Sequence, residues 1–198
     1  MKSILFVLLA TATLHTACNN KSKDTATVTS KDGAEQVTVD PTKLQEAAQD
    51  MLKIKEELTN LTPLTVDELK ALFPAQLMGA PASDLNVSAF SGASVADAKY
   101  KINDSTDIKL TVIDCAGPGG AGIYNMQYLG MYNFQEDTDE EYTKTIDFNG
   151  GKAFENCKKK RNDCNFTYFS ARRFLISLEG DNVGIDALKD VAKGLNIK

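Results

Sequence analysis

A short turn in the second half of the chain constrains its fold more than any other feature. Asn149, Gly150 and Gly151 separate two runs with the alternation of strands, at 141–148 and 152–157. Asn-Gly adopts the left-handed backbone conformation that tight hairpin turns require, so we expect the two runs to pair antiparallel. Alternating or β-branched residues predict five more strands, at 87–91, 98–102, 107–114, 164–169 and 173–179.

Helical periodicity predicts four helices around these strands. They span 42–60, 66–73, 121–133 and 184–195. The second helix follows a capping box formed by Thr65 and Glu68, and Pro74 stops it. The element order is therefore dominated by hairpins, with helices at three places along the sheet-forming region.

This order predicts the fold class. We expect an α+β fold with a mainly antiparallel sheet and packed helices, arranged as a single-domain sandwich at 63–198. An amphipathic helix at 41–62 precedes it. The apolar residues of that helix either dock on the domain or use the seam of Leu44, Met51 and Leu58 for a partner.

The N-terminus has the pattern of an export signal. Residues 1–17 contain a lone Lys2 and a short apolar run at 4–10, which is too short to span a bilayer, and Cys18 follows. Cleavage after the Ala-Thr-Ala sequence at 10–12 is one reading, and it would leave Cys18 as a plain thiol. The polar residues 19–40 have no sustained apolar period and predict a flexible tether.

The same segment resembles the precursors of bacterial lipoproteins. Thr16, Ala17 and Cys18 fit the last three positions of a lipobox, while His15 stands where leucine is usual. The resemblance implies that Cys18 is acylated with fatty acids such as palmitate. A membrane would then be a partner through this anchor, and residues 18–40 would form the lipidated cysteine and its tether. We expect location in the cell envelope, at the outer membrane, on its periplasmic or surface side.

Two further resemblances concern the rest of the chain. The segments LTPLTVDELKALFP at 61–74 and IDCAGPGGAGI at 113–123 resemble small uncharacterised envelope lipoproteins of the Bacteroidota. The order of elements resembles the PsbP-type sandwich. These resemblances imply envelope location and a fold, and they carry no functional residues to this chain.

Composition and histidine content exclude several classes of function. The 198-residue chain is 42% hydrophobic and has a formal net charge of -5, so nucleic acid is a poor partner. The only histidine is His15, which would leave with the signal. A Ser-His-Asp triad, a Cys-His protease and a His-ligated zinc site are then excluded.

A glycine-rich segment follows the predicted strand at 107–114. Gly117, Gly119 and Gly122 match G-x-G-x-x-G, and Gly120 adds a fourth glycine. A dinucleotide site would need a parallel βαβ unit, which the hairpins argue against. The other readings are a tight turn into a helix or backbone N–H groups that hold an anion. We expect no cofactor and no metal.

The segment at 115–135 lacks any charged residue. Tyr124, Tyr128 and Tyr132 recur on one stripe of the predicted helix. This helix is either buried between the sheet and the N-terminal helix, or it presents a surface for a partner or ligand.

The cysteines and the charged loops have structural explanations. Cys157 and Cys164 bracket a loop between two strands, so export predicts a disulfide between them. Cys115 is then a buried free thiol. The basic run at 158–161 and the acidic run at 136–141 are expected to be solvated, with contact between neighbouring copies left open.

The sequence favours a binding role over catalysis. We expect a lipid-anchored, non-catalytic module that binds an envelope protein or a small ligand through the Gly117–Gly122 turn and the tyrosine stripe. The alternative is an envelope hydrolase or transferase that uses carboxylate and serine chemistry. That alternative requires a cleft in which two acids converge.

Overall fold

The structure is a computed structural model that describes 26–28, 37–39, 41–90, 92–128 and 134–197. Side chains are described from 49 onward, except those of 90 and 128. The chain divides into two compact units, Met1–Ala48 and Gln49–Lys198. The expected signal at 1–17 and the lipidation site Cys18 lie outside the described residues.

The described residues of the first unit include a pair of short strands. Strand β1 (Ala26–Val28) pairs antiparallel with β2 (Val37–Val39). Both strands fall within the segment that we expected to be a tether, and both consist largely of β-branched residues, which favour extended backbone. Helix α1 (Pro41–Asn60) begins in this unit and continues into the second.

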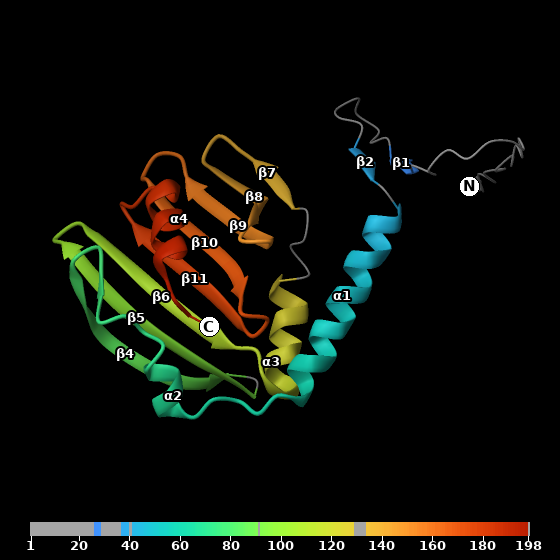
Figure 1. The fold of residues 1–198 in the computed structure, drawn as a ribbon. Helices are drawn as coiled ribbons and strands as arrows, with labels where there is room; N and C mark the ends of the chain where they lie inside the picture. The colour runs from blue at the N-terminus through green and yellow to red at the C-terminus, as the bar shows by residue number, and fades with distance from the viewer. Residues whose placement is uncertain (1–25, 29–36, 40, 91, 129–133, 198) are drawn as a thin grey trace, which may run out of the picture. The chain divides into compact units, whose positions relative to one another are not determined.

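The described part of the second unit contains a nine-stranded antiparallel sheet (Figure 1). Its strands are β3 (Gln76–Leu77), β4 (Ala80–Phe90), β5 (Ala93–Asn103), β6 (Thr106–Asp114), β7 (Gln135–Asp137), β8 (Glu141–Phe148), β9 (Gly151–Lys158), β10 (Asp163–Ser170) and β11 (Phe174–Asp181). They lie in the order β3-β4-β5-β6-β11-β10-β9-β8-β7. The prediction of an α+β class with a mainly antiparallel sheet is therefore confirmed, and the sheet is the larger part.

The hairpin between β8 and β9 forms as the sequence predicted. Phe148 lies opposite Gly151, and the two residues between them have positive φ angles of 49° at Asn149 and 80° at Gly150. The short strands β3 and β7 were not predicted, because two or three residues show no period. Strand β4 begins before the predicted residue 87, with a register shift between Ser83 and Asn86.

The described part of the second unit contains three further helical segments. They are α2 (Val66–Lys70), α3 (Gly117–Ile123) with the π-helical turn η1 (Tyr124–Tyr128), and α4 (Ile185–Gly194). The capping box of α2 forms, since Thr65 N donates to Glu68 Oε2 at 2.9 Å and Glu68 N donates to Thr65 Oγ1 at 3.3 Å. Helix α3 begins four residues before the predicted start, and 129–133 of the predicted helix lie outside the described residues.

The helices cover the two faces of the sheet unequally. Helices α4 and α2 pack on one face, where Leu188 and Leu69 are buried with Tyr100, Leu110 and Phe166 (Figure 1). The other face has a second, smaller core. Its buried members are Ile54, Leu58, Ala93, Cys115, Ala121, Ile123, Tyr124, Phe154 and Leu175. No helix in the described segments has both the length and the apolar composition needed to cross a membrane.

The expected disulfide joins two strands. Cys157 on β9 lies directly opposite Cys164 on β10, and their sulfurs are bonded. The bond closes the β9–β10 turn, which carries the basic run. Cys115, the remaining cysteine of the second unit, is free and buried.

Removal of this disulfide should destabilise the domain. In the Cys157→Ala, Cys164→Ala double variant, we expect urea denaturation to give a free energy of unfolding lower by about 2–3 kcal/mol, because a cross-link reduces the entropy of the unfolded chain. A reductant should lower the wild-type value to that of the variant and leave the variant unchanged. Equal stability of the oxidised wild type and the double variant would contradict this assignment.

Candidate functional site

The glycine-rich segment packs closely against the chain around it. Gly117 has a φ of 76°, and a Cβ there would lie 3.2 Å from Pro63 Cγ. A Cβ at Gly120 would lie only 2.4 Å from the carbonyl carbon of Cys115, so a side chain has no room. Gly122 faces open space. Two of the four glycines are therefore explained by the tight entry from β6 into α3.

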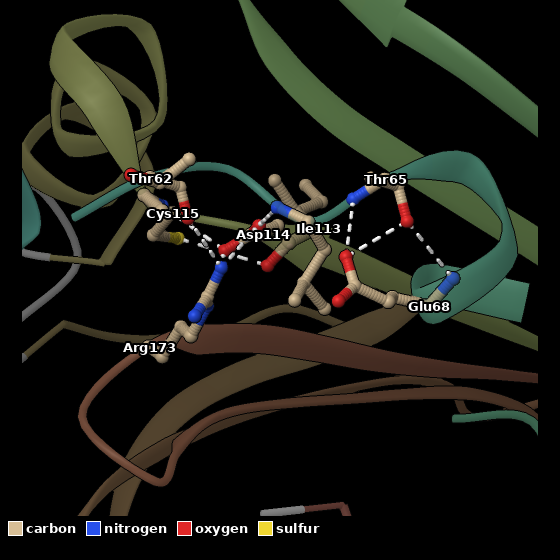
Figure 2. Close-up of polar contacts among 9 residues, drawn as sticks. Thr62, Thr65, Glu68, Ile113, Asp114, Cys115 and Arg173 are labelled. Carbon is tan, nitrogen blue, oxygen red and sulfur yellow. Dashed lines mark hydrogen bonds and ion pairs between the residues drawn. The ribbon is translucent and has the colours of Figure 1, made fainter. Parts of the chain in front are cut away.

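Asp114 lies at the end of β6, just before this segment, and it is fully buried. Its carboxylate accepts hydrogen bonds from Leu64 N at 2.7 Å and Ala116 N at 3.1 Å (Figure 2). Arg173 donates two more, from Nε to Oδ1 at 2.8 Å and from Nη2 to Oδ2 at 2.9 Å. This bidentate pairing is the strong geometry for an arginine and a carboxylate.

Arg173 connects three parts of the chain through this pair. It immediately precedes β11, and its Nη2 also donates to the carbonyl oxygen of Thr62 at 2.9 Å. The hydrogen bonds to Asp114 raise the pKa of the Arg173 guanidinium above its ordinary value. The cluster joins the segment before α2, the end of β6 and the start of β11, and we interpret it as a structural clamp.

Cys115 belongs to the same clamp. Its N–H donates to the carbonyl oxygen of Arg173 at 2.9 Å, and its sulfur lies 3.8 Å from the carbonyl oxygen of Ile113 (Figure 2). Burial raises the pKa of the thiol to about 12. Since the thiolate is the reactive form, this cysteine is a poor nucleophile at neutral pH.

The predicted tyrosine stripe is not an exposed surface at Tyr124. This residue is only 1% exposed, and its ring centroid lies 4.5 Å from that of Phe169. The side chain of Tyr128 and the whole of Tyr132 lie outside the described residues. A π-helical turn pairs residues five apart, so faces predicted from the 3.6-residue period do not apply along η1.

A pocket lies where η1 meets the sheet. It has a volume of about 370 Å³, and Met126 and Gln127 of η1 form part of its wall. The remaining lining residues come from three adjacent strands: Thr143 of β8, Phe154 and Asn156 of β9, and Asn165 and Thr167 of β10. The sequence pattern did not single out these residues, although Thr143 and Thr145 on β8 and Asn165 and Thr167 on β10 recur at every second position.

Hydrogen bonds between side chains hold the polar part of this pocket. Asn156 Nδ2 donates to Thr143 Oγ1 at 2.7 Å and to the carbonyl oxygen of Tyr142 at 3.3 Å. Asn165 Nδ2 donates to Ser177 Oγ at 3.1 Å, and Thr167 Oγ1 donates to Asn165 Oδ1 at 2.9 Å. The polar groups are therefore preorganised by their neighbours.

A second hollow gathers carboxylates around the β5–β6 turn, the β9–β10 turn and the end of β11. It has a volume of about 470 Å³. Its lining residues are Asp104, Ser105, Asp107, Arg161, Asp163, Asp181 and Asn182. Asp107 pairs with Lys99 at 2.9 Å, and Asp163 pairs with Arg161 at 3.0 Å. Within the described ranges, no three His, Cys, Asp or Glu side chains are arranged to hold a metal ion.

The basic and acidic loops contact each other within one molecule. Lys159 forms an ion pair with Asp137, and its N–H donates to the carbonyl oxygen of Glu140 at 2.7 Å. The two runs of opposite charge thus meet at adjacent turns of the sheet. The ion pair within one molecule neutralises part of the charge through which neighbouring copies of the chain could attract each other.

Removing the Arg173 side chain from the clamp should lower the free energy of unfolding far more than removing the neighbouring Arg172 from its exposed ion pair. Arg173→Met leaves Asp114 buried without a cation, so we expect the free energy of unfolding to fall by about 3–5 kcal/mol in urea denaturation. Arg172→Met is the matched control, because Arg172 pairs with Glu57 at an exposed site and should cost below about 1 kcal/mol. Similar losses in the two variants would refute the clamp.

Comparisons with known proteins identify no relative of this chain. Protein-family models, curated proteins and solved structures were compared with the chain, and none matches it. The interpretation of the site therefore rests on the side chains of the pocket and the clamp.

Proposed function

We propose that this chain is a lipid-anchored binding protein of the cell envelope, which holds a small ligand in the pocket between η1 and strands β8, β9 and β10. The pocket itself carries the proposal. Its volume of about 370 Å³ falls within the range of ligand sites, and its lining combines an apolar part with a few polar side chains. That combination is typical of sites that bind a small molecule.

The lining favours binding over catalysis. Its described residues contribute amide, hydroxyl and apolar groups, and none of them is an acid or a base. The carboxylates that an envelope hydrolase or transferase would need gather in the other hollow, where Asp107 and Asp163 are each paired with a cation. Those pairs favour a structural role for both acids over a role in proton transfer.

The disulfide supports an exported location. Disulfides such as that between Cys157 and Cys164 persist in oxidising compartments outside the cytosol. The lipobox-like end of residues 1–17 adds a site of attachment, Cys18, and residues 18–40 would separate the domain from the membrane. In this proposal the domain at 63–198 is a single sandwich, with the amphipathic helix docked on it through Ile54 and Leu58.

Lipidation of Cys18 can be tested by metabolic labelling. Cells that express the full chain and are fed a palmitate analogue should incorporate it, because the thiol of Cys18 would be the acylated group. The Cys18→Ala chain should not be labelled and should leave the membrane fraction. An unlabelled wild-type chain would contradict lipidation and favour the alternative, a secretory signal that is cleaved without acylation of Cys18.

The binding role can be tested by photo-crosslinking from the pocket wall. A photoreactive amino acid in place of Met126 should yield an adduct of defined mass in cells, because this side chain lines the pocket and is 65% exposed. The matched control places the same amino acid at Met78, which is 55% exposed in the turn between β3 and β4. No adduct, or the same adduct from both positions, would refute a ligand in this pocket.

A further inference from the structure

We propose that the free edge of strand β4 pairs with the same edge of a second copy of this chain and so joins the two sheets into one. The paired stretch is 86–90, and the interaction does not involve the pocket beside η1. Three observations lead to it: this stretch has one open side among the described residues, it lacks the features that protect sheet edges, and its outward main-chain groups are self-complementary.

Strand β4 lies near the margin of the sheet, with β5 along one side (Figure 1). On its other side, β3 covers only the beginning, where Ala80 and Pro81 pair with Leu77 and Gln76. Within the part of the chain that the structure describes, no strand pairs with 83–90 on that side. Main-chain groups that point outward from this stretch are therefore open to another strand.

The protection of the sheet edges does not extend to 86–90. The opposite edge strand, β7, is only three residues long and includes Glu136 and Asp137. On β4, a register shift and the positive φ of 51° at Asp84 distort the strand just before residue 86. Short length, charge and bulges are features that keep edges from pairing. The stretch 86–90 contains no charged residue, no proline and no register shift.

Two residues of this stretch direct their main-chain groups outward. In an antiparallel pair, every second residue exchanges hydrogen bonds with the partner strand, and the residues between them face away. Phe90 pairs with Ala93 across a two-residue hairpin turn, where the closing pair exchanges these hydrogen bonds. Counting back from Phe90, Val87 and Ala89 therefore direct their N–H and C=O groups away from β5.

A two-fold axis at Ser88 uses all of these outward groups. Identical strands related by such an axis run antiparallel, as β4 and β5 already do. When Ser88 faces Ser88 of the second copy, Val87 of each chain lies opposite Ala89 of the other. Each outward N–H then meets a carbonyl oxygen, and no outward group of 87–89 is left without a partner.

The side chains are compatible with the same register. Val87 packs against the core under α4 and α2, and Ala89 lies on the same face because strand side chains alternate. Their pairing across the axis would extend that core from one copy into the next. Asp84, the nearest charged residue on β4, lies outside the paired stretch in both copies. Like charges, which destabilise directly opposed positions, therefore do not meet.

Sedimentation velocity of the full chain tests the dimer. The chain carries Cys18→Ala, so that acylation of this residue does not bring copies together. We expect a reversible monomer–dimer equilibrium that is weak, because the paired stretch is far shorter than the roughly 20 residues a side of a stable interface. A monomer up to millimolar concentration, or growth beyond the dimer, would overturn the proposal.

A charge at the axis provides the matched comparison. Ser88→Lys places two ammonium groups opposite each other and should raise the Kd of the dimer about tenfold or more. Ser105→Lys changes an equally exposed serine in the β5–β6 turn and should leave the Kd unchanged. Equal Kd values for the two variants would contradict pairing at residue 88.

A mixture of variants tests the two-fold axis itself. Ser88→Glu alone should also weaken the dimer, since two carboxylates then meet. An equimolar mixture of the Ser88→Glu and Ser88→Lys chains should associate more tightly than either variant alone, because opposite charges face each other across the axis. This rescue also shows that both variants fold. A mixture that associates no better than its components would refute self-pairing.

Disulfide crosslinking tests the same contact in cells. The Cα atoms of residue 88 in the two copies would lie about 4.5 Å apart, within the range of about 4.4–6.8 Å that a disulfide spans. In the Cys18→Ala chain, Ser88→Cys should yield a disulfide-linked dimer, and Ser105→Cys should not. If residue 88 instead forms a disulfide with a different protein and no dimer appears, the edge takes another partner and the proposal is wrong. None of these results depends on the pocket.

Discussion

The buried carboxylate of Asp114 is the point on which the described sheet domain depends. Strands β6 and β11 are neighbours in the sheet, although four strands separate them along the chain. Asp114 ends one of these strands and Arg173 precedes the other, so their bidentate pair fixes where the two groups of hairpins join. The same carboxylate holds Leu64 N and Ala116 N, and it thereby positions the segment before α2 and the start of α3. A buried charge with four donors is stable there because each of its lone-pair directions is used.

The helices pack differently on the two faces of the sheet, and this difference explains where the candidate pocket lies. On the face under α4, Glu155 is buried between Lys144 at 2.8 Å and Lys189 at 2.5 Å, so an ion triad joins the helix to the sheet. The hydrogen bond between Lys144 and Glu155 raises the pKa of the Lys144 ammonium group above its ordinary value. On the opposite face, α3, η1 and the end of α1 pack on part of the sheet, and strands β8, β9 and β10 present Thr and Asn beside η1. The pocket occurs at the boundary between the covered and uncovered parts.

Local features of the fold could be predicted from the sequence, and long-range placements could not. The Asn149–Gly150 turn and the capping box at Thr65 depend on a few adjacent residues, so their patterns were sufficient. The burial of Tyr124 depends on Phe169, which is 45 positions away, and on a π-helical turn that no periodicity revealed. Asn156 and Asn165 form one rim only because β9 and β10 align in a particular register. The candidate pocket is a product of that register.

The close packing of α3 links the clamp to the pocket. Gly120 has no space for a side chain against Cys115, and Gly117 needs a left-handed backbone beside Pro63, so the helix can leave Asp114 in only one direction. That direction carries Tyr124 into the core, and the wider turn of η1 then brings Met126 to the solvent side above the strands. π-Helical turns are rare and are frequently found at functional sites. The glycines that match G-x-G-x-x-G therefore contribute to the candidate pocket indirectly, by setting the position of its wall.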